Sequence, residues 1–331
     1  DKYRILIDKG IDGFWNDMNE PAIFYSEKHL KEVFEKMEDY KTMNLDVNTF
    51  FEMTGMIGSI CNNPGDYASF YHNYRGKRYR HDQVHNLFGY YMTRSASEAF
   101  ERYVPEKRIL LFSRASYIGM HRFGGIWQGD NASWWSHLKM NVKMMPSLNM
   151  CGFLYTGADV GGFGADATED LVLRWLEFAV FTPLLRNHSA RGTRRQEVYR
   201  FSHVEKFADV IGVRYQILPY IYSEYMKAAL RNTMMFNPLS FLYGEDALAG
   251  QVEDQLFIGE NVMVAPVCEQ NMSGRVVYFP ERMKQLIFKD GIVEEGKVYE
   301  KGFSYVKMPM GTVHVFLREG YLFPVAKGGK C

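Results

Sequence analysis

The 331-residue sequence predicts an α/β fold: a (β/α)8 TIM-type barrel followed by a small antiparallel β-sandwich. Short apolar runs alternate with helical stretches over the first two thirds of the chain, and most of these runs end in a polar or charged residue. After about Leu239 the period changes to short strands separated by turns. We therefore assign residues 1–239 to the barrel part and residues 240–331 to the sandwich.

The barrel part begins with a predicted buried strand around Phe14, which lies between Gly10 and the helix-incompatible Pro21. Apolar residues at helical spacing predict a helix over 28–41, and Asn62–Asp66 has the composition of a turn. The remaining barrel elements are helices over 78–101, 132–147 and 169–180 and strands over 108–113, 125–127, 152–156 and 181–185.

A long helix over 204–231, with Pro219 as a kink, precedes the sandwich. The sandwich strands are expected at 255–257, 262–266, 275–279, 285–288, 304–308 and 314–318. Because these runs are short and separated by turn residues, they favour an antiparallel arrangement.

The charge balance is neutral, since Lys plus Arg and Asp plus Glu both number 39. This balance argues against nucleic acid or an anionic membrane as the main partner, and no apolar run is long enough to span a bilayer. The four cysteines are far apart and show no CxxC spacing, which favours reduced thiols in a cytoplasmic protein. They are Cys61, Cys151, Cys268 and Cys331.

Acidic and amide side chains follow the first strand directly, in the run Trp15-Asn16-Asp17-Met18-Asn19-Glu20-Pro21. Carboxylates at the end of a buried strand are costly unless they are paired or used. A single Asp here could be structural, but Asp17 and Glu20 lie beside Trp15 and Met18. Apolar surfaces for a sugar ring next to carboxylates for acid–base or nucleophilic work indicate a carbohydrate site.

The same run resembles the nucleophile signature of glycoside hydrolase family 31, the retaining α-glucosidase family, in its bacterial or glucosidase-II-like form. The resemblance implies that Asp17 is the catalytic nucleophile. The segment 123–131 (FGGIWQGDN) resembles the acid/base motif of the family, which makes Asp130 the proton donor. Arg114, the segment 157–163 (GADVGGF) and the run 186–188 (RNH) resemble further family positions that contact the sugar.

The resemblance therefore implies a substrate-binding set around the two catalytic carboxylates, with Glu20 in a supporting role. We expect these side chains to line one cleft, because each follows a predicted strand at its carboxyl end. The expected set is Trp15, Met18, Arg114, Trp127, Asp159, Phe163 and His188.

Two patterns invite other chemistry. His81 and His85 lie four residues apart on a predicted helix, as in zinc proteases, but Asp82 replaces the expected Glu and no third ligand stands at a suitable distance. The glycines of 157–162 lack the spacing of a dinucleotide-binding loop. We therefore expect no metal and no cofactor.

In the family the nucleophile follows the fourth barrel strand. The resemblance thus implies that this chain contains the barrel only from about that strand onward, and that a missing N-terminal part belongs to the same polypeptide. Residues 27–80 carry no family motif, and we expect them to shape specificity.

The expected function is a retaining exo-α-glucosidase that releases terminal glucose from maltose- or isomaltose-type oligosaccharides through a glucosyl-aspartate intermediate. A sugar acceptor in place of water would give transglucosylation. The alternatives are another family activity such as α-xylosidase, a non-catalytic carbohydrate-binding homologue, or a metal-dependent barrel hydrolase. Both α-1,4 and α-1,6 linkages stay open, as does a homo-oligomeric state.

Overall fold

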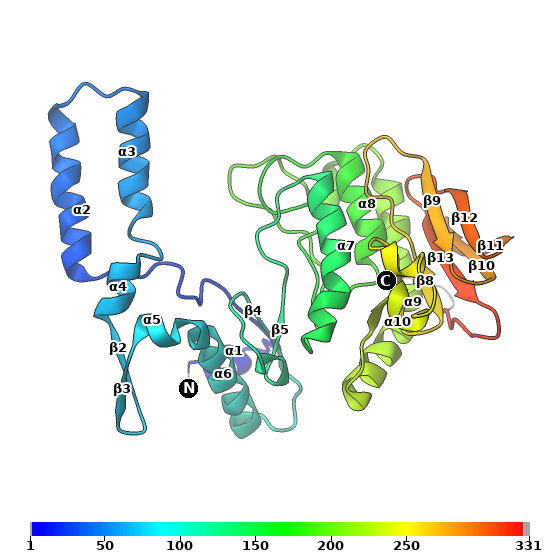
Figure 1. Cartoon of the computed structure of the whole chain (residues 1–331), viewed down its shortest axis with the longest axis horizontal. Helices are drawn as coiled ribbons and strands as arrows, with labels where there is room; N and C mark the ends of the chain where they lie inside the picture. Colours follow the sequence, from blue (N-terminus) through cyan, green and yellow to red (C-terminus); the bar gives the residue numbers. More distant parts are fainter. Residues whose placement is uncertain (1, 327–331) are drawn as a thin grey trace. The chain divides into compact units, whose positions relative to one another are not determined.

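The computed structural model describes residues 2–326 and divides into two compact units, Asp1–Gly124 and Gly125–Cys331 (Figure 1).

The first unit contains one strand–helix–strand motif and a long excursion within it. Its helices are α1 (Arg4–Ile7), α2 (Glu27–Asp39), α3 (Val47–Gly58), α4 (Pro64–Ser69), α5 (His81–Val84) and α6 (Phe88–Tyr103). Its strands are β1 (Gly13–Asn16), β2 (Tyr71–Tyr74), β3 (Lys77–Arg80) and β4 (Leu110–Ser113), and short 3₁₀ turns lie at Tyr40–Thr42, His85–Leu87 and Met120–Arg122.

Strands β1 and β4 pair in parallel, with Gly13 opposite Leu110 and Asn16 opposite Ser113. Helix α6 packs against this pair through a small core formed by Ile7, Phe14, Ala96, Phe100 and Leu111. A parallel pair joined through a helix is the βαβ unit expected of the barrel. Because both strands end at the same edge, the residues that follow them lie close together.

The excursion between β1 and α6 differs in part from the prediction. Helix α2 matches the predicted span and is capped by the Ser26 hydroxyl, which accepts a hydrogen bond from the backbone N–H of His29. The predicted turn at 62–66 is instead the start of α4, because the Asn63 side chain caps that helix.

The prediction of a single helix over 78–101 is wrong. The segment begins with strand β3, which pairs with β2 in an antiparallel hairpin, and only then continues as α5 and α6. Arg75 and Gly76 form the hairpin turn with φ angles of 48° and 74°. A left-handed pair at both central positions matches the strand twist, but an Arg-Gly turn lacks the usual Asn-Gly or Asp-Gly signature.

The second unit contains the later barrel elements and the C-terminal sheets. Its helices are α7 (Trp135–Met150), α8 (Glu169–Ala179), α9 (Val204–Arg231) and α10 (Leu239–Leu242), and short 3₁₀ turns lie at Val198–Arg200 and Ala249–Gln251. Its strands are β5 (Gly125–Ile126), β6 (Phe236–Pro238), β7 (Leu256–Ile258), β8 (Val262–Val264), β9 (Gly274–Phe279), β10 (Met283–Lys289), β11 (Ile292–Tyr299), β12 (Gly302–Lys307) and β13 (Val313–Arg318).

The segments predicted as strands at 152–156 and 181–185 do not form regular strands. They still bond to their neighbours as in a parallel sheet: the N–H groups of Ile126 and Leu184 donate to the carbonyls of Tyr155 and Thr156. At Gly157 an added Cβ would lie 2.1 Å from the Leu184 carbonyl oxygen. The backbones approach so closely here that only glycine fits, and the regular ladder is interrupted.

Two antiparallel sheets form the C-terminal region. The six-stranded sheet has the order β11-β10-β13-β8-β7-β6, and β12 pairs with β9 in the second sheet. Their facing side chains share one core, which includes Phe257, Met263, Val277, Phe279, Val306 and Phe316. The antiparallel expectation is confirmed; β6 and β11 are additional strands. Strand β6 begins at Phe236, just before the predicted boundary, and the boundary at residue 239 stays a prediction.

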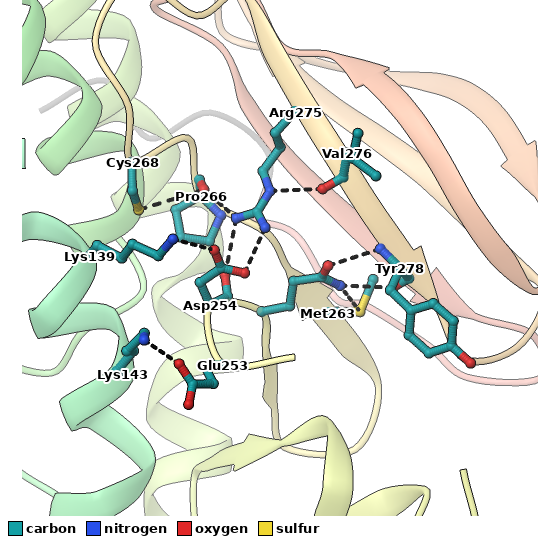
Figure 2. Close-up of polar contacts among 11 residues, drawn as sticks. Lys139, Lys143, Glu253, Asp254, Met263, Pro266, Cys268, Arg275, Val276 and Tyr278 are labelled. Carbon is teal, nitrogen blue, oxygen red and sulfur yellow. Dashed lines mark hydrogen bonds and ion pairs between the residues drawn. The ribbon is translucent and has the colours of Figure 1, made fainter. Parts of the chain in front are cut away.

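Helix α7 is attached directly to the C-terminal region (Figure 2). The Asp254 carboxylate pairs with Arg275 of β9 at 2.6 Å and with Lys139 of α7 at 3.5 Å, and Lys143 pairs with Glu253. Helices α7, α8 and α9 also share a buried core with strands of the six-stranded sheet. The barrel helices and the sheets of this unit are therefore one packed body.

Within residues 2–326, none of the helices is both long enough and apolar enough to cross a membrane.

Candidate active site

Asp17 lies immediately after β1, on a loop that the end of β4 holds in place. The buried Asn19 side chain donates through Nδ2 to Ser113 Oγ at 2.8 Å and accepts the Ala115 N–H through Oδ1 at 3.0 Å. Met18 has a φ of 54°, a left-handed conformation that is rare for this residue type. Such strain persists only where the surroundings impose it, and it concentrates at functional sites.

Arg114, which follows β4, joins the acidic residues of this loop. Its Nε and Nη2 atoms donate to the two Glu20 carboxylate oxygens at 2.7 and 2.9 Å, and its Nη1 lies 3.2 Å from Asp17 Oδ1. Partial burial alone would raise the pKa of Glu20, but the hydrogen bonds and charge of Arg114 bring the net pKa below its ordinary value. The guanidinium thus holds Glu20 in a forked, two-bond geometry and pairs with Asp17 through its remaining nitrogen.

Apolar side chains border Asp17. Trp15 stacks on the Phe112 ring with centroids 6.1 Å apart and planes inclined by 10°, and about a third of its surface stays exposed. Met18 is also exposed. An exposed indole face beside a carboxylate suits the apolar face of a sugar ring.

Asp130 lies on the loop that follows β5 in the second unit. It is exposed, although Trp127 and Gln128 before it and Asn131 after it are buried. Gly129 has a φ of 83°, which turns the backbone sharply just before Asp130. The loop therefore presents a single carboxyl group from otherwise buried surroundings.

Asp159 is completely buried and pairs with Arg186, whose Nε lies 2.5 Å from Asp159 Oδ1. The second carboxylate oxygen, Oδ2, has no hydrogen-bond partner within the described residues. Burial raises the pKa of Asp159, Arg186 and His188 oppose this shift, and the negative charge of Asp130 adds to it. The Arg186 guanidinium also lies over the Trp127 ring at 5.4 Å.

Phe163 and His188 stack with ring centroids 5.3 Å apart. Their loops are joined by backbone hydrogen bonds, because Val160 N donates to Arg186 O at 2.9 Å and Ala190 N donates to Phe163 O at 2.8 Å. These two residues and Asp159 are therefore held on adjoining loops.

The structure brings the predicted residues together in two sets, one in each unit. Trp15, Asp17, Met18, Glu20 and Arg114 form the first set, and Trp127, Asp130, Asp159, Phe163 and His188 form the second. Their roles, the single cleft and the distance between the two catalytic carboxyl groups stay predictions.

Sequence reasoning missed the residues that support these sets. Arg186 stands in the run that singled out His188 and could have been identified from its strand-end position. Asn19 stands inside the first motif. Gln196 carries no such signal: its buried Nε2 donates to the carbonyls of Val160 and Gly162, and only the fold brings these groups together.

The paired histidines belong to an aromatic cluster. His81 is fully buried, stacks on Phe24 with centroids 4.3 Å apart, and shares a 2.8 Å hydrogen bond with His72. Burial and the neighbouring histidines lower the pKa of His81. No three His, Cys, Asp or Glu side chains within residues 2–326 are arranged to hold a metal ion.

Curated relatives match nearly the whole chain. Alpha-glucosidase 2 of Bacillus thermoamyloliquefaciens is 31% identical over 324 residues, which are 97% of this chain and 36% of that protein. An alpha-glucosidase of Saccharolobus solfataricus is 29% identical over 327 residues, which are 96% of this chain and 43% of that protein. The chain thus spans well under half the length of these relatives.

Among solved structures, a family 31 dextranase of Flavobacterium johnsoniae superposes with a TM-score of 0.76 at 24% identity, over 98% of this chain and 36% of that protein. At this identity the likeness supports the fold.

Family models match both parts of the chain. The model of the glycosyl hydrolases family 31 TIM-barrel domain matches residues 1–224, and the model of the glycosyl hydrolase family 31 C-terminal domain matches residues 232–323. The first match alone covers more than half of the chain, and the chain belongs to glycosyl hydrolase family 31.

Proposed function

We propose that the polypeptide to which this chain belongs is a retaining exo-α-glucosidase. The observation that carries the proposal is the arrangement around Arg114, whose guanidinium lies between Asp17 and Glu20 at the common edge of β1 and β4. Membership of the family and relatives that are α-glucosidases support it further.

In the proposed first step, the Asp17 carboxylate attacks the anomeric carbon and forms an ester bond to it. The bond from that carbon to the leaving oxygen breaks, and Asp130 gives its proton to that oxygen. A water oxygen then bonds to the anomeric carbon while Asp130 takes one of the water's protons, and the glucosyl–aspartate bond breaks to release glucose with its original configuration. A sugar hydroxyl in place of water gives transglucosylation.

The surrounding residues suit binding of the sugar. Trp15 and Met18 offer apolar surface beside Asp17, and Oδ2 of Asp159, which has no hydrogen-bond partner among the described residues, is an acceptor for a sugar hydroxyl. Phe163 and His188 offer a stacked edge on the neighbouring loop. A retaining mechanism requires the two catalytic carboxyl groups to lie roughly 5–5.5 Å apart.

The stereochemistry of the first-formed sugar tests this mechanism in the full polypeptide. Proton NMR during hydrolysis of 4-nitrophenyl α-glucoside, which has no reducing-end glucose, should detect α-glucose before mutarotation, whereas initial β-glucose would contradict the proposal. Maltose, isomaltose and an α-xyloside assayed in parallel separate glucosidase from xylosidase activity.

Two variants assign the roles of the carboxylates. Asp17→Ala should abolish turnover of every glucoside, because no covalent intermediate forms. Asp130→Ala should lower kcat/KM for maltose far more than kcat/KM for 4-nitrophenyl α-glucoside, whose leaving group departs with little protonation. Equal losses of kcat/KM on both substrates would exclude Asp130 as the acid.

A further inference from the structure

The exposed carboxyl group of Asp130 lies between two buried amide side chains. Gln128 and Asn131 are 9% and 3% exposed, while Asp130 itself is exposed. Buried amides need hydrogen-bond partners, so their contacts determine where the backbone between them lies.

Helix α7 supplies them, and one of its residues contacts both amides. Asn141 Nδ2 donates to Asn131 Oδ1 at 3.2 Å, and the Asn141 backbone carbonyl accepts from Gln128 Nε2 at 3.4 Å. Gln128 Nε2 also contacts Met145 Sδ at 3.1 Å. The loop is thus held from both sides of Asp130 by Asn141, which is only 1% exposed.

Asn131 extends the same contact network to the second loop of the site. Its Nδ2 donates to Gly129 O at 3.2 Å, which closes the turn around Asp130. Its backbone carbonyl accepts the N–H groups of Phe163 and Gly164 at 2.6 and 2.9 Å. Asn131 therefore links α7, the Asp130 loop and the loop that carries Phe163.

Helix α7 is a rigid support for these contacts. Leu138, Val142 and Met145 are at most 1% exposed and belong to the main core of the unit. Lys139 and Lys143 also attach the helix to the C-terminal region through Asp254 and Glu253 (Figure 2). A group that must be placed to within about 0.5 Å needs support of this kind.

We propose that Asn141 is a positioning residue for the Asp130 carboxyl group and acts through Asn131. This inference rests on the proposed role of Asp130 as the acid that protonates the leaving oxygen. Asn141 lies on the helix behind the loop and acts by holding the loop backbone, through its side chain to Asn131 and through its carbonyl to Gln128.

The proposal predicts a selective effect of Asn141→Ala in the full polypeptide. The loss of the Nδ2 donor leaves the buried Asn131 Oδ1 without its partner, and the loop gains freedom around Asp130. Misplacement of a catalytic group by about 1 Å can cost on the order of 100-fold in rate. We expect kcat/KM for maltose to fall roughly 10- to 100-fold and that for 4-nitrophenyl α-glucoside to fall less than about 3-fold.

Asn149 provides a matched control on the same helix. It is 3% exposed, and its side chain donates to Phe153 O and accepts the N–H groups of Met235 and Phe236, far along the chain from the Asp130 loop. Asn149→Ala should destabilise the fold at least as much as Asn141→Ala. It should nevertheless leave the ratio of the two kcat/KM values unchanged. Thermal unfolding of both variants verifies that their stabilities are comparable.

Three outcomes decide the question. A ratio that changes in Asn141→Ala but not in Asn149→Ala supports the proposal. Proportional losses on both substrates in both variants would overturn it and make Asn141 purely structural. If Asp130→Ala itself shows no dependence on the leaving group, the proposed function fails instead. Should Asn141→Ala not fold, Asn141→Ser leaves a smaller void, and its hydroxyl is too short to replace the bond to Asn131.

Discussion

Each unit contains an arginine paired with carboxylates of the candidate site, and the two pairs differ in burial. Arg114 in the first unit is 24% exposed, and its partners Asp17 and Glu20 are each 35% exposed. Arg186 in the second unit is 19% exposed, but its partner Asp159 is completely buried. The same pair of chemical groups therefore occupies two different environments.

This difference in burial changes what each pair contributes to the stability of the fold. Solvent screens the Arg114 pair, so that its contribution to stability is small and its main effect is to orient two carboxylates. The Asp159 carboxylate is excluded from water, and its pairing with Arg186 offsets the free-energy cost of this desolvation. Burial raises the pKa of Asp159, whereas Arg114 lowers that of Glu20. The contribution of an arginine–carboxylate pair to stability thus depends on how far the pair is buried.

The largest expected effect is that of Arg186→Ala. It leaves the Asp159 charge buried without its cation and should cost about 3–5 kcal/mol in the free energy of unfolding. Urea unfolding followed by tryptophan fluorescence reports on this unit, which holds four of the five tryptophans. A second change, Asp159→Asn, should recover part of the loss because it removes the charge. A loss below about 1 kcal/mol in Arg186→Ala would show that Asp159 is better solvated than its burial indicates.

His314 of β13 offers a second test of how burial shifts a pKa, because it is a buried titratable group outside the candidate active site. Burial, reinforced by the charge of Arg174, lowers the pKa of His314 to about 4 from 6.5. Below pH 6.5 the unfolded chain binds a proton that the folded chain does not, so stability falls as pH falls from 6.5 to 4. The loss should reach about 3 kcal/mol.

Measurement of unfolding free energy across this pH range checks the His314 prediction, with His314→Asn as the control. The variant lacks the titrating group and should lose correspondingly less stability on acidification. Parallel curves for the two proteins would contradict the prediction.

Arg114→Ala should have the opposite balance of effects from Arg186→Ala. Because the pair is partly exposed, the unfolding free energy should fall by no more than about 1 kcal/mol. Activity should nevertheless fall on the order of 100-fold in kcat, since the variant loses a donor that orients Asp17. A large loss of stability with little loss of activity would reverse the comparison between the two pairs.

The smallest expected effect concerns Glu20. Its lowered pKa means that its contribution is present above its ordinary pKa of 4.5 and is lost as pH falls through the folded value. After allowance for solvent screening, the stability difference between the native protein and Glu20→Gln should stay below about 1 kcal/mol at pH 7. It should shrink further below pH 4.5. A difference that grows on acidification would show that Glu20 is stabilised in its protonated form.

Local sequence patterns predict much of the secondary structure. Helices α2, α8 and α9 appear within one or two residues of their predicted ends, because each is a long segment with helical spacing and clear boundaries. Strand β11 was missed because its sequence, IVEEGKVY, has no regular apolar–polar alternation and three of its eight residues are charged; six of the eight are exposed in the structure. The hairpin of β2 and β3 was missed because its Arg-Gly turn is an uncommon one.

The first half of the candidate site is also contained in the sequence. Asp17 and Arg114 are each the first residue after a predicted strand, and parallel pairing of those strands brings them together. The family resemblance placed both residues at the site, and the expected barrel is consistent with this because the carboxyl ends of parallel strands share one edge.

Tertiary structure alone decided how the site residues are held. Hydrogen bonds join Asn141 to Asn131 and Gln196 to Val160 and Gly162, pairs whose separation along the chain carries no periodic signal. The burial of Asp159 likewise carries no signal in the local sequence. Local propensity determines helices and strands because it acts between near neighbours. Burial and the pKa shifts that follow from it depend on every element packed around a group, and they arise only when the chain is folded.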